Sequence, residues 1–235
     1  MPAAAQPAKT AAQPAQAATP AEQRDDAEVA RRLAFIQGRL DRGERSAKIW
    51  WHAWYTGYLT LAVGQGVIAV AVKSKETRAD MAVGAVESAL GAGALGVFDF
   101  PARYAGSAVH ALPEGTPEER RHKLAVAETL LRKSAEGEAF GRSWIAHAAC
   151  AAVAAGSGLL LGFGYKRGWA ALTNVIGSIA ISEVQIWTQP TAAIGDWKDY
   201  QAGAFGGAAR PAQKAPGAWW QVSVLPGGVG VVGAF

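Results

Sequence analysis

Hydrophobic and polar positions separate along the 235-residue chain into long apolar runs joined by short charged stretches. Residues 49–72 and 143–165 contain no Asp, Glu, Lys or Arg. Each run leads through a short basic segment into a second apolar run with a single glutamate, residues 81–98 and 169–187. A helix of about 23 residues is roughly 35 Å long, enough to cross a hydrocarbon core of about 30 Å. The pattern predicts four apolar helices in two helical hairpins.

An offset of 93 residues superimposes the second hairpin on the first. Trp51 then aligns with Trp144 and Lys73 with Lys166, and the register continues without a gap to about residue 91. Neither copy can bury its apolar face alone. We therefore predict an internal repeat whose two copies pack as a pseudo-symmetric bundle.

Each hairpin is preceded by an amphipathic segment with apolar residues at spacings of three and four, such as Val29, Leu33 and Ile36. The predicted organisation is a disordered Ala/Pro/Gln-rich tail (1–23), a first repeat (24–101), a second repeat (102–200), a linker (201–217) and a β-hairpin tail (218–235). The tail is predicted from two strand-like runs around Pro226, Gly227 and Gly228. The predicted fold class is an all-α membrane protein of two repeated helical hairpins, with amphipathic lead-in helices and a small C-terminal β-hairpin.

Composition favours a membrane over a nucleic acid as the partner. Half of the residues are hydrophobic and 18% are charged, against about 25% in soluble domains. The 23 basic and 19 acidic residues are spread over flanks and hairpin tips rather than clustered on one domain. We expect the lipid bilayer as partner, and a second copy or an envelope protein at the C-terminal hairpin. A soluble helical bundle with an unusually apolar core stays open, because Ala and Gly are only moderately hydrophobic.

Three polar residues inside the apolar runs are the candidate functional site: Glu87, Glu183 and Gln185. A carboxylate in such a run needs a partner, a cavity or water. Under the 93-residue offset Glu183 aligns with Leu90, so the two carboxylates are predicted to point to faces about 60° apart. Close together, they would hold a proton or a cation. The alternative is that each hydrogen-bonds Ser, Thr or Trp groups on a neighbouring helix.

Aromatic and histidine side chains near the start of each hairpin are predicted to lie at the membrane interface. They are Trp50, Trp51, Trp54, His52, Trp144 and His147. The two histidines are out of register by two residues and would face nearly opposite ways, and no Cys-x-x-Cys-His occurs, which argues against haem. No catalytic, metal or cofactor residues are predicted, because no nucleophile or glycine-rich loop has a supporting local signature.

Several short motifs resemble a family of uncharacterised bacterial envelope proteins. They are residues 183–190 (EVQIWTQP), 142–144 (RSW), 116–120 (TPEER) and a Pro-Gly-Gly turn before the terminal Phe235. The resemblance implies a helical envelope protein, often with an export signal, and no assigned activity. Such a signal is not recognisable in residues 1–23.

The expected function is a structural or scaffolding role in a bacterial envelope, without enzyme activity. The inner membrane is favoured; the outer membrane or the periplasmic face would follow if a signal peptide precedes the chain. The alternative is a small transporter or channel subunit that uses Glu87 and Glu183, and a second alternative is a soluble helical-bundle binding protein.

Overall fold

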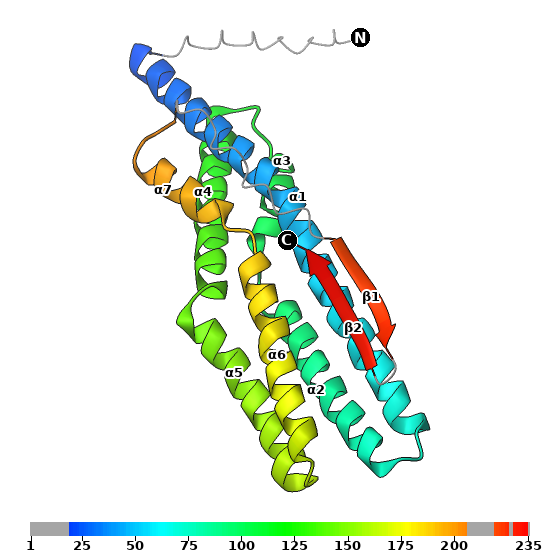
Figure 1. Cartoon of the computed structure of the whole chain (residues 1–235). Helices are drawn as coiled ribbons and strands as arrows, with labels where there is room; N and C mark the ends of the chain where they lie inside the picture. The colour runs from blue at the N-terminus through cyan, green and yellow to red at the C-terminus, as the bar shows by residue number, and fades with distance from the viewer. Residues whose placement is uncertain (1–18, 206–218, 226–227, 235) are drawn as a thin grey trace, which may run out of the picture.

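The computed structural model describes residues 19–205, 219–225 and 228–234, and the first of these ranges consists of helices joined by short turns (Figure 1). The helices are α1 (Pro20–Ala71), α2 (Lys75–Val97), the 3₁₀ turn η1 (Pro101–Arg103), α3 (Ala105–His110), α4 (Pro117–Gly141), α5 (Trp144–Leu159), the π-helical segment η2 (Leu160–Gly164), α6 (Gly168–Thr188) and α7 (Ala192–Gln201). Strands β1 (Trp219–Leu225) and β2 (Gly228–Ala234) pair antiparallel.

Local sequence signals set the starts of the two longest charged segments. Thr19 caps α1 and Thr116 caps α4, each in a capping box with a glutamate three residues later and a proline at the first helical position. Both side chains satisfy backbone N–H groups that a helix start leaves without an intrahelical partner. The amphipathic helix predicted at the start of the first repeat (24–101) therefore begins at Pro20, within the tail predicted to be disordered. Residues 1–18 and 206–218 of the predicted tail and linker lie outside the described residues.

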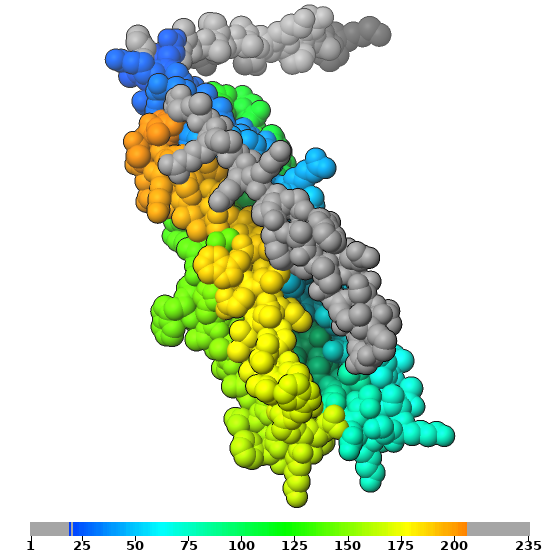
Figure 2. Space-filling model, viewed as in Figure 1, coloured from blue at the N-terminus to red at the C-terminus, as the bar shows by residue number. Residues whose placement is uncertain are grey.

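The chain forms two parts that share the long helix α1. The first part, here called the head, comprises residues 20–48 of α1 with η1, α3, α4 and α7. The second part, here called the bundle, comprises residues 49–71 of α1 with α2, α5, η2 and α6. In Figure 2 the α5–α6 hairpin (yellow-green and yellow) and the α1–α2 hairpin (cyan) lie side by side in the lower half of the molecule.

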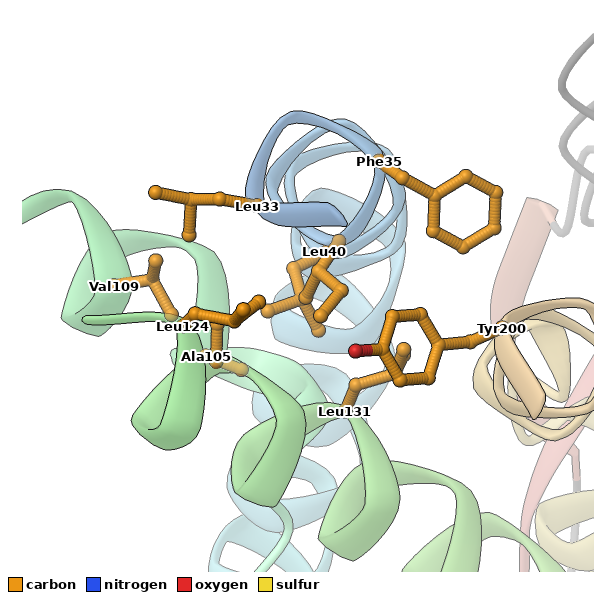
Figure 3. Packing of buried hydrophobic residues seen from close by; sticks show 10 residues of the cluster. Leu33, Phe35, Leu40, Ala105, Val109, Leu124, Leu131 and Tyr200 are labelled. Carbon is orange, nitrogen blue, oxygen red and sulfur yellow. The ribbon is translucent and has the colours of Figure 1, made fainter. Parts of the chain in front are cut away.

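The head has an ordinary hydrophobic core. Leu33, Ile36 and Leu40 project from one face of α1 towards α3, α4 and α7, as Figure 3 shows for the labelled residues. Ile36 and Leu131 are completely buried. The other buried members of the cluster are Phe35, Ala105, Val109, Leu124, Ala127 and Tyr200. The amphipathic stripes read from the sequence thus face each other in the head.

The bundle differs, because much of its apolar surface points outward. Two helices are long and apolar enough to cross a membrane: α2, with a mean hydropathy of 1.2, and Trp144–Gly164, with 1.7. Only 22% and 17% of these stretches is buried inside the molecule. Among the largest exposed apolar side chains are Val63, Val70, Val86, Phe163 and Ile176.

The predicted fold class, four apolar helices with a small β-hairpin, is wrong. Among the described residues only the two helices named above meet the requirements of a membrane span. The apolar run on α1 has no charged residue and the run on α6 has only one. Both carry polar groups that lower their mean hydropathy, among them Gln65, Asn174 and Gln185. Residues 19–205 contain no strand, and the two strands of the structure are confined to 219–225 and 228–234.

The two hairpins have matching helix boundaries but different lead-ins. The first helix of each ends at Ala71 and Gly164, and the second begins at Lys75 and Gly168, an offset of 93 residues in both cases. The internal repeat itself stays a prediction. Whereas α1 runs unbroken from head to bundle, the second lead-in stops at Gly141 and the chain restarts as α5. A Cβ atom on Gly141 would collide with the side-chain amide of Gln189, which packs closely here and would have to shift.

Truncation of the head core should destabilise the protein. Leu131→Ala removes a completely buried side chain and is expected to cost about 2–5 kcal/mol of unfolding free energy. Val70→Ala is the matched control, because Val70 is 85% exposed. Thermal unfolding of both variants in mild detergent measures the difference, and an equal loss of stability would contradict the described core.

Candidate functional site

Glu87 lies at the centre of a polar cluster inside the bundle. Its carboxylate accepts hydrogen bonds from Asn174 Nδ2 at 2.8 Å, from Ser178 Oγ at 3.1 Å, and from the hydroxyl of Ser157. All three donors belong to the second hairpin, whereas Glu87 belongs to the first. A carboxylate among apolar helices is tolerated when donors of this kind satisfy its oxygens. The cluster therefore joins the hairpins at mid-height.

Glu183 has different partners. Its carboxylate lies 2.8 Å from Nδ1 of His147 on α5 and accepts a hydrogen bond from Nε1 of Trp187, 3.0 Å away. The side chains of His147 and Glu183 are about one-third exposed, 31% and 36%. This pair lies within the second hairpin and ties the start of α5 to the end of α6.

The structure thus gives the predicted site residues separate surroundings. Among the described residues no hydrogen bond joins Glu87 to Glu183, and no group of three or more His, Cys, Asp or Glu side chains is placed to hold a metal ion. Gln185, the third candidate, accepts a hydrogen bond from the hydroxyl of Tyr58 at 2.7 Å. Glu87 thus has serine partners on neighbouring helices, as in the alternative interpretation, whereas Glu183 pairs with His147 and with Trp187 of its own helix.

The contacts between the hairpins are polar at several levels, and together they form what is here called the seam. Near the head, the indole nitrogens of Trp50 and Trp54 lie 3.2 and 3.3 Å from Thr188 Oγ1. The contacts of Tyr58 and of Glu87 follow further down. At the far end Arg167 forms ion pairs with Asp80 and Glu76, at 2.8 and 2.9 Å. Side-chain hydrogen bonds between helices are a common means of association where no hydrophobic driving force exists.

Sequence reasoning missed the partners of both glutamates, although a signal was present. In an antiparallel hairpin, residues at similar distances from the turn lie opposite each other. His147 and Glu183 lie on opposite sides of the turn at residues 165–167, at comparable distances from it. Ser157 and Asn174 are related in the same way, closer to the turn.

The predicted interfacial residues occupy two kinds of position. Trp144 is 77% exposed on the bundle surface, and His52 is also exposed. Trp51 is buried, because its ring stacks under the guanidinium of Arg103 at 4.0 Å and its indole nitrogen donates to the carbonyl of Leu95. Trp51 thus packs from α1 against the residues at the end of α2 and after it, and its position at a membrane interface stays a prediction.

Two exposed tryptophans on α6 mark the ends of the bundle. Trp169 is 77% and Trp187 is 62% exposed. Their separation of 18 positions corresponds to five helical turns, so they lie on the same face of α6, about 27 Å apart. The thickness of a hydrocarbon core is similar, about 30 Å.

A buried carboxyl group lies at the joint between the head and the bundle. Glu138 of α4 is 2% exposed, and its Oε2 accepts a hydrogen bond from the backbone N–H of Ile194 at 3.2 Å, in the first turn of α7. Burial raises the pKa of Glu138 to about 8, and the nearby carboxylate of Asp196 acts in the same direction, while backbone donors and Arg142 oppose the shift. Glu138 was not predicted from sequence, although it continues the apolar stripe of Leu124 and Leu131 at a spacing of seven.

Comparisons with models of protein families, with curated proteins and with solved structures find no match to this chain. The resemblance to bacterial envelope proteins therefore stays a prediction.

Removal of the Glu87 acceptor should destabilise the bundle. Glu87→Ala leaves three half-buried donors without their partner and is expected to cost about 1–3 kcal/mol. Glu87→Gln retains an acceptor oxygen and should cost less. Glu76→Ala is the control, because this side chain is 77% exposed at the hairpin tip. Melting temperatures in detergent test the order, and equal effects of Glu87→Ala and Glu76→Ala would contradict it.

Stability should depend on pH through Glu138. Its raised pKa means that, between about pH 4.5 and pH 8, the folded protein holds a proton that the unfolded chain has released. The free energy of unfolding therefore falls as pH rises through this window. Glu138→Gln keeps a neutral group there and should reduce that fall by several kcal/mol, since each unit of pKa change corresponds to about 1.4 kcal/mol. Thermal unfolding of both proteins at about pH 5 and about pH 8.5 measures this, and parallel pH profiles would contradict it.

Proposed function

We propose that this protein is a structural membrane protein, with the bundle embedded in a lipid bilayer and the head at the membrane surface. The observation that carries the proposal is the contrast in burial between the two parts. The head buries its apolar side chains in a core, whereas four-fifths of the apolar length of α2 and of Trp144–Gly164 stays outside. Soluble monomers rarely expose large contiguous apolar patches.

The dimensions of the bundle support the same role. Helix α2 has 23 residues, about 34 Å at 1.5 Å per residue, which matches the apolar thickness of a bilayer. Exposed Trp144 and Trp187 lie at the head end of their helices, and exposed Trp169 lies at the opposite end. Tryptophan favours both interfaces of a membrane, so these side chains mark two levels about one hydrocarbon core apart.

The seam supports a structural role rather than transport. Glu87 and Gln185 each have a partner on the opposite hairpin, and Glu183 has two partners within its own hairpin. Such satisfied contacts stabilise one arrangement of the helices, which is what a scaffold needs. The bacterial envelope is the proposed setting, on the basis of the resemblance described above, and the head is the part left available to a partner outside the bilayer.

Fractionation of cells that express the untagged chain tests the membrane part of the proposal. The protein is expected to resist carbonate and to require detergent. Val86→Arg, at the middle of α2 and 60% exposed, should shift a large part of the protein to the soluble or aggregated fraction, because arginine at the centre of a span costs about 2.5–3.5 kcal/mol. Ala125→Arg adds the same charge to an exposed position of the head and is the control. Release of the wild-type protein by carbonate would establish the soluble-bundle alternative.

A flux assay separates the scaffold from the transporter. Purified protein in proton- or cation-loaded liposomes is expected to give no flux, both as wild type and as Glu87→Gln or Glu183→Gln. A wild-type flux that either substitution abolishes would replace the scaffold by the transport alternative.

A further inference from the structure

The tips of the two hairpins meet at the end of the bundle that lies away from the head. This basic tip comprises residues 73–80, which include the first turns of α2, and residues 165–168, which lead into α6. It contains five basic and two acidic side chains, a net charge of +3. The ion pairs of Arg167 with Asp80 and Glu76 bring the two segments together.

Three lysines of the basic tip have no ion pair within the described part of the chain. Both acidic side chains of the tip face Arg167, and Arg78 donates to the carbonyl of Val72 at 2.9 Å. The lysines that remain are Lys73, Lys75 and Lys166. In the head, by contrast, the protein pairs arginines across its helices, as in Arg39–Asp196, Arg32–Glu128 and Arg120–Asp26. The net positive charge of the tip is therefore available to an anion from outside the chain.

The surroundings of these lysines are those of a membrane interface. A hollow of about 470 Å³ lies between the two segments. Lys166 and Trp169 contribute to its lining, together with Arg167 and the two carboxylates that pair with it, Glu76 and Asp80. Trp169 is 77% exposed beside it, and Tyr165 is 49% exposed. Aromatic side chains of this kind lie at the level of lipid headgroups, where lysines extend their ammonium groups towards the phosphates.

We propose that the basic tip binds the headgroups of anionic phospholipids through Lys73, Lys75 and Lys166. The proposal rests on the membrane location proposed above. A headgroup with a phosphodiester and no compensating ammonium, such as phosphatidylglycerol, supplies the missing negative charge, and phosphatidylcholine does not. Each lysine near an anionic surface contributes about 1 kcal/mol, which corresponds to about a fivefold change in affinity.

Lys166 offers a substitution that removes charge without damage to the fold. Its φ angle is +57°, a left-handed conformation that favours glycine over other residues. Lys166→Gly should therefore leave the turn intact or stabilise it. Lys73→Gln and Lys75→Gln remove the other two charges. Lys133→Gln is the matched control, because Lys133 is an exposed lysine of α4 in the head, remote in sequence from the tip.

The test uses the purified full chain in a neutral detergent, with melting temperature as the readout of lipid binding. Added phosphatidylglycerol should raise the melting temperature of the wild type and of Lys133→Gln more than phosphatidylcholine does. The variant that combines Lys73→Gln, Lys75→Gln and Lys166→Gly should lose this selectivity, with about a hundredfold weaker affinity if the three effects add. About 0.5 M salt should weaken the wild-type response as well.

Other outcomes would overturn the proposal. A preference for phosphatidylglycerol that survives the triple substitution places the anion site elsewhere on the protein. An equal shift with soluble glycerophosphate identifies the ligand as a free phosphate compound rather than a lipid. A protein that needs detergent yet responds equally to both lipids refutes the headgroup site alone, whereas a protein released by carbonate refutes the membrane location itself.

Discussion

The hydrogen bonds that Glu87 receives from the second hairpin are the contact on which the bundle depends. An ionised or neutral carboxyl group between apolar helices must have partners, and Ser157, Asn174 and Ser178 supply them from α5 and α6. Because these donors lie on the opposite hairpin, satisfying the carboxylate also sets the depth and rotation at which the hairpins meet. A packing of apolar side chains alone would allow them to slide, since the apolar surface is similar along each helix.

The same constraint explains why the bundle is apolar outside and polar at its seam. Helices that lie in lipid gain little from burying leucine or valine against each other, so polar contacts and close approach of small residues hold them together. Two glycines show such close approach. A Cβ atom on Gly91 would press against the ring of Tyr58, and one on Gly158 would press against the side chain of Val175. In the head the arrangement is reversed, since its apolar side chains are buried against one another and this burial stabilises the packing.

The joint between head and bundle lies where the helix that leads into the second hairpin is interrupted; the corresponding helix of the first hairpin, α1, is continuous. Helix α1 continues straight into the bundle, but the second lead-in ends at Gly141, where Gln189 packs closely and Arg142 donates to the carbonyls of Trp187 and Gln189. Before the break α4 packs against α1 in the head core, and after it α5 continues into the bundle (Figure 1). Glu138 is buried near this break against the first turn of α7, and its raised pKa makes the stability of the joint depend on pH.

The sequence by itself determined the helical elements, the hairpin turns, the apolar faces and the basic tips, because hydrophobic periodicity, capping residues and runs without charge are local properties. It overestimated the number of membrane spans, since runs without charge on α1 and α6 still contain amide and hydroxyl groups. Only the tertiary structure decided which partners Glu87 and Glu183 have, that Trp51 is buried under Arg103, and that Glu138 is a core residue. The physical reason is that hydrogen bonds and desolvation depend on groups brought from distant positions in the chain, and a periodic pattern tells which face is buried but not what it is buried against.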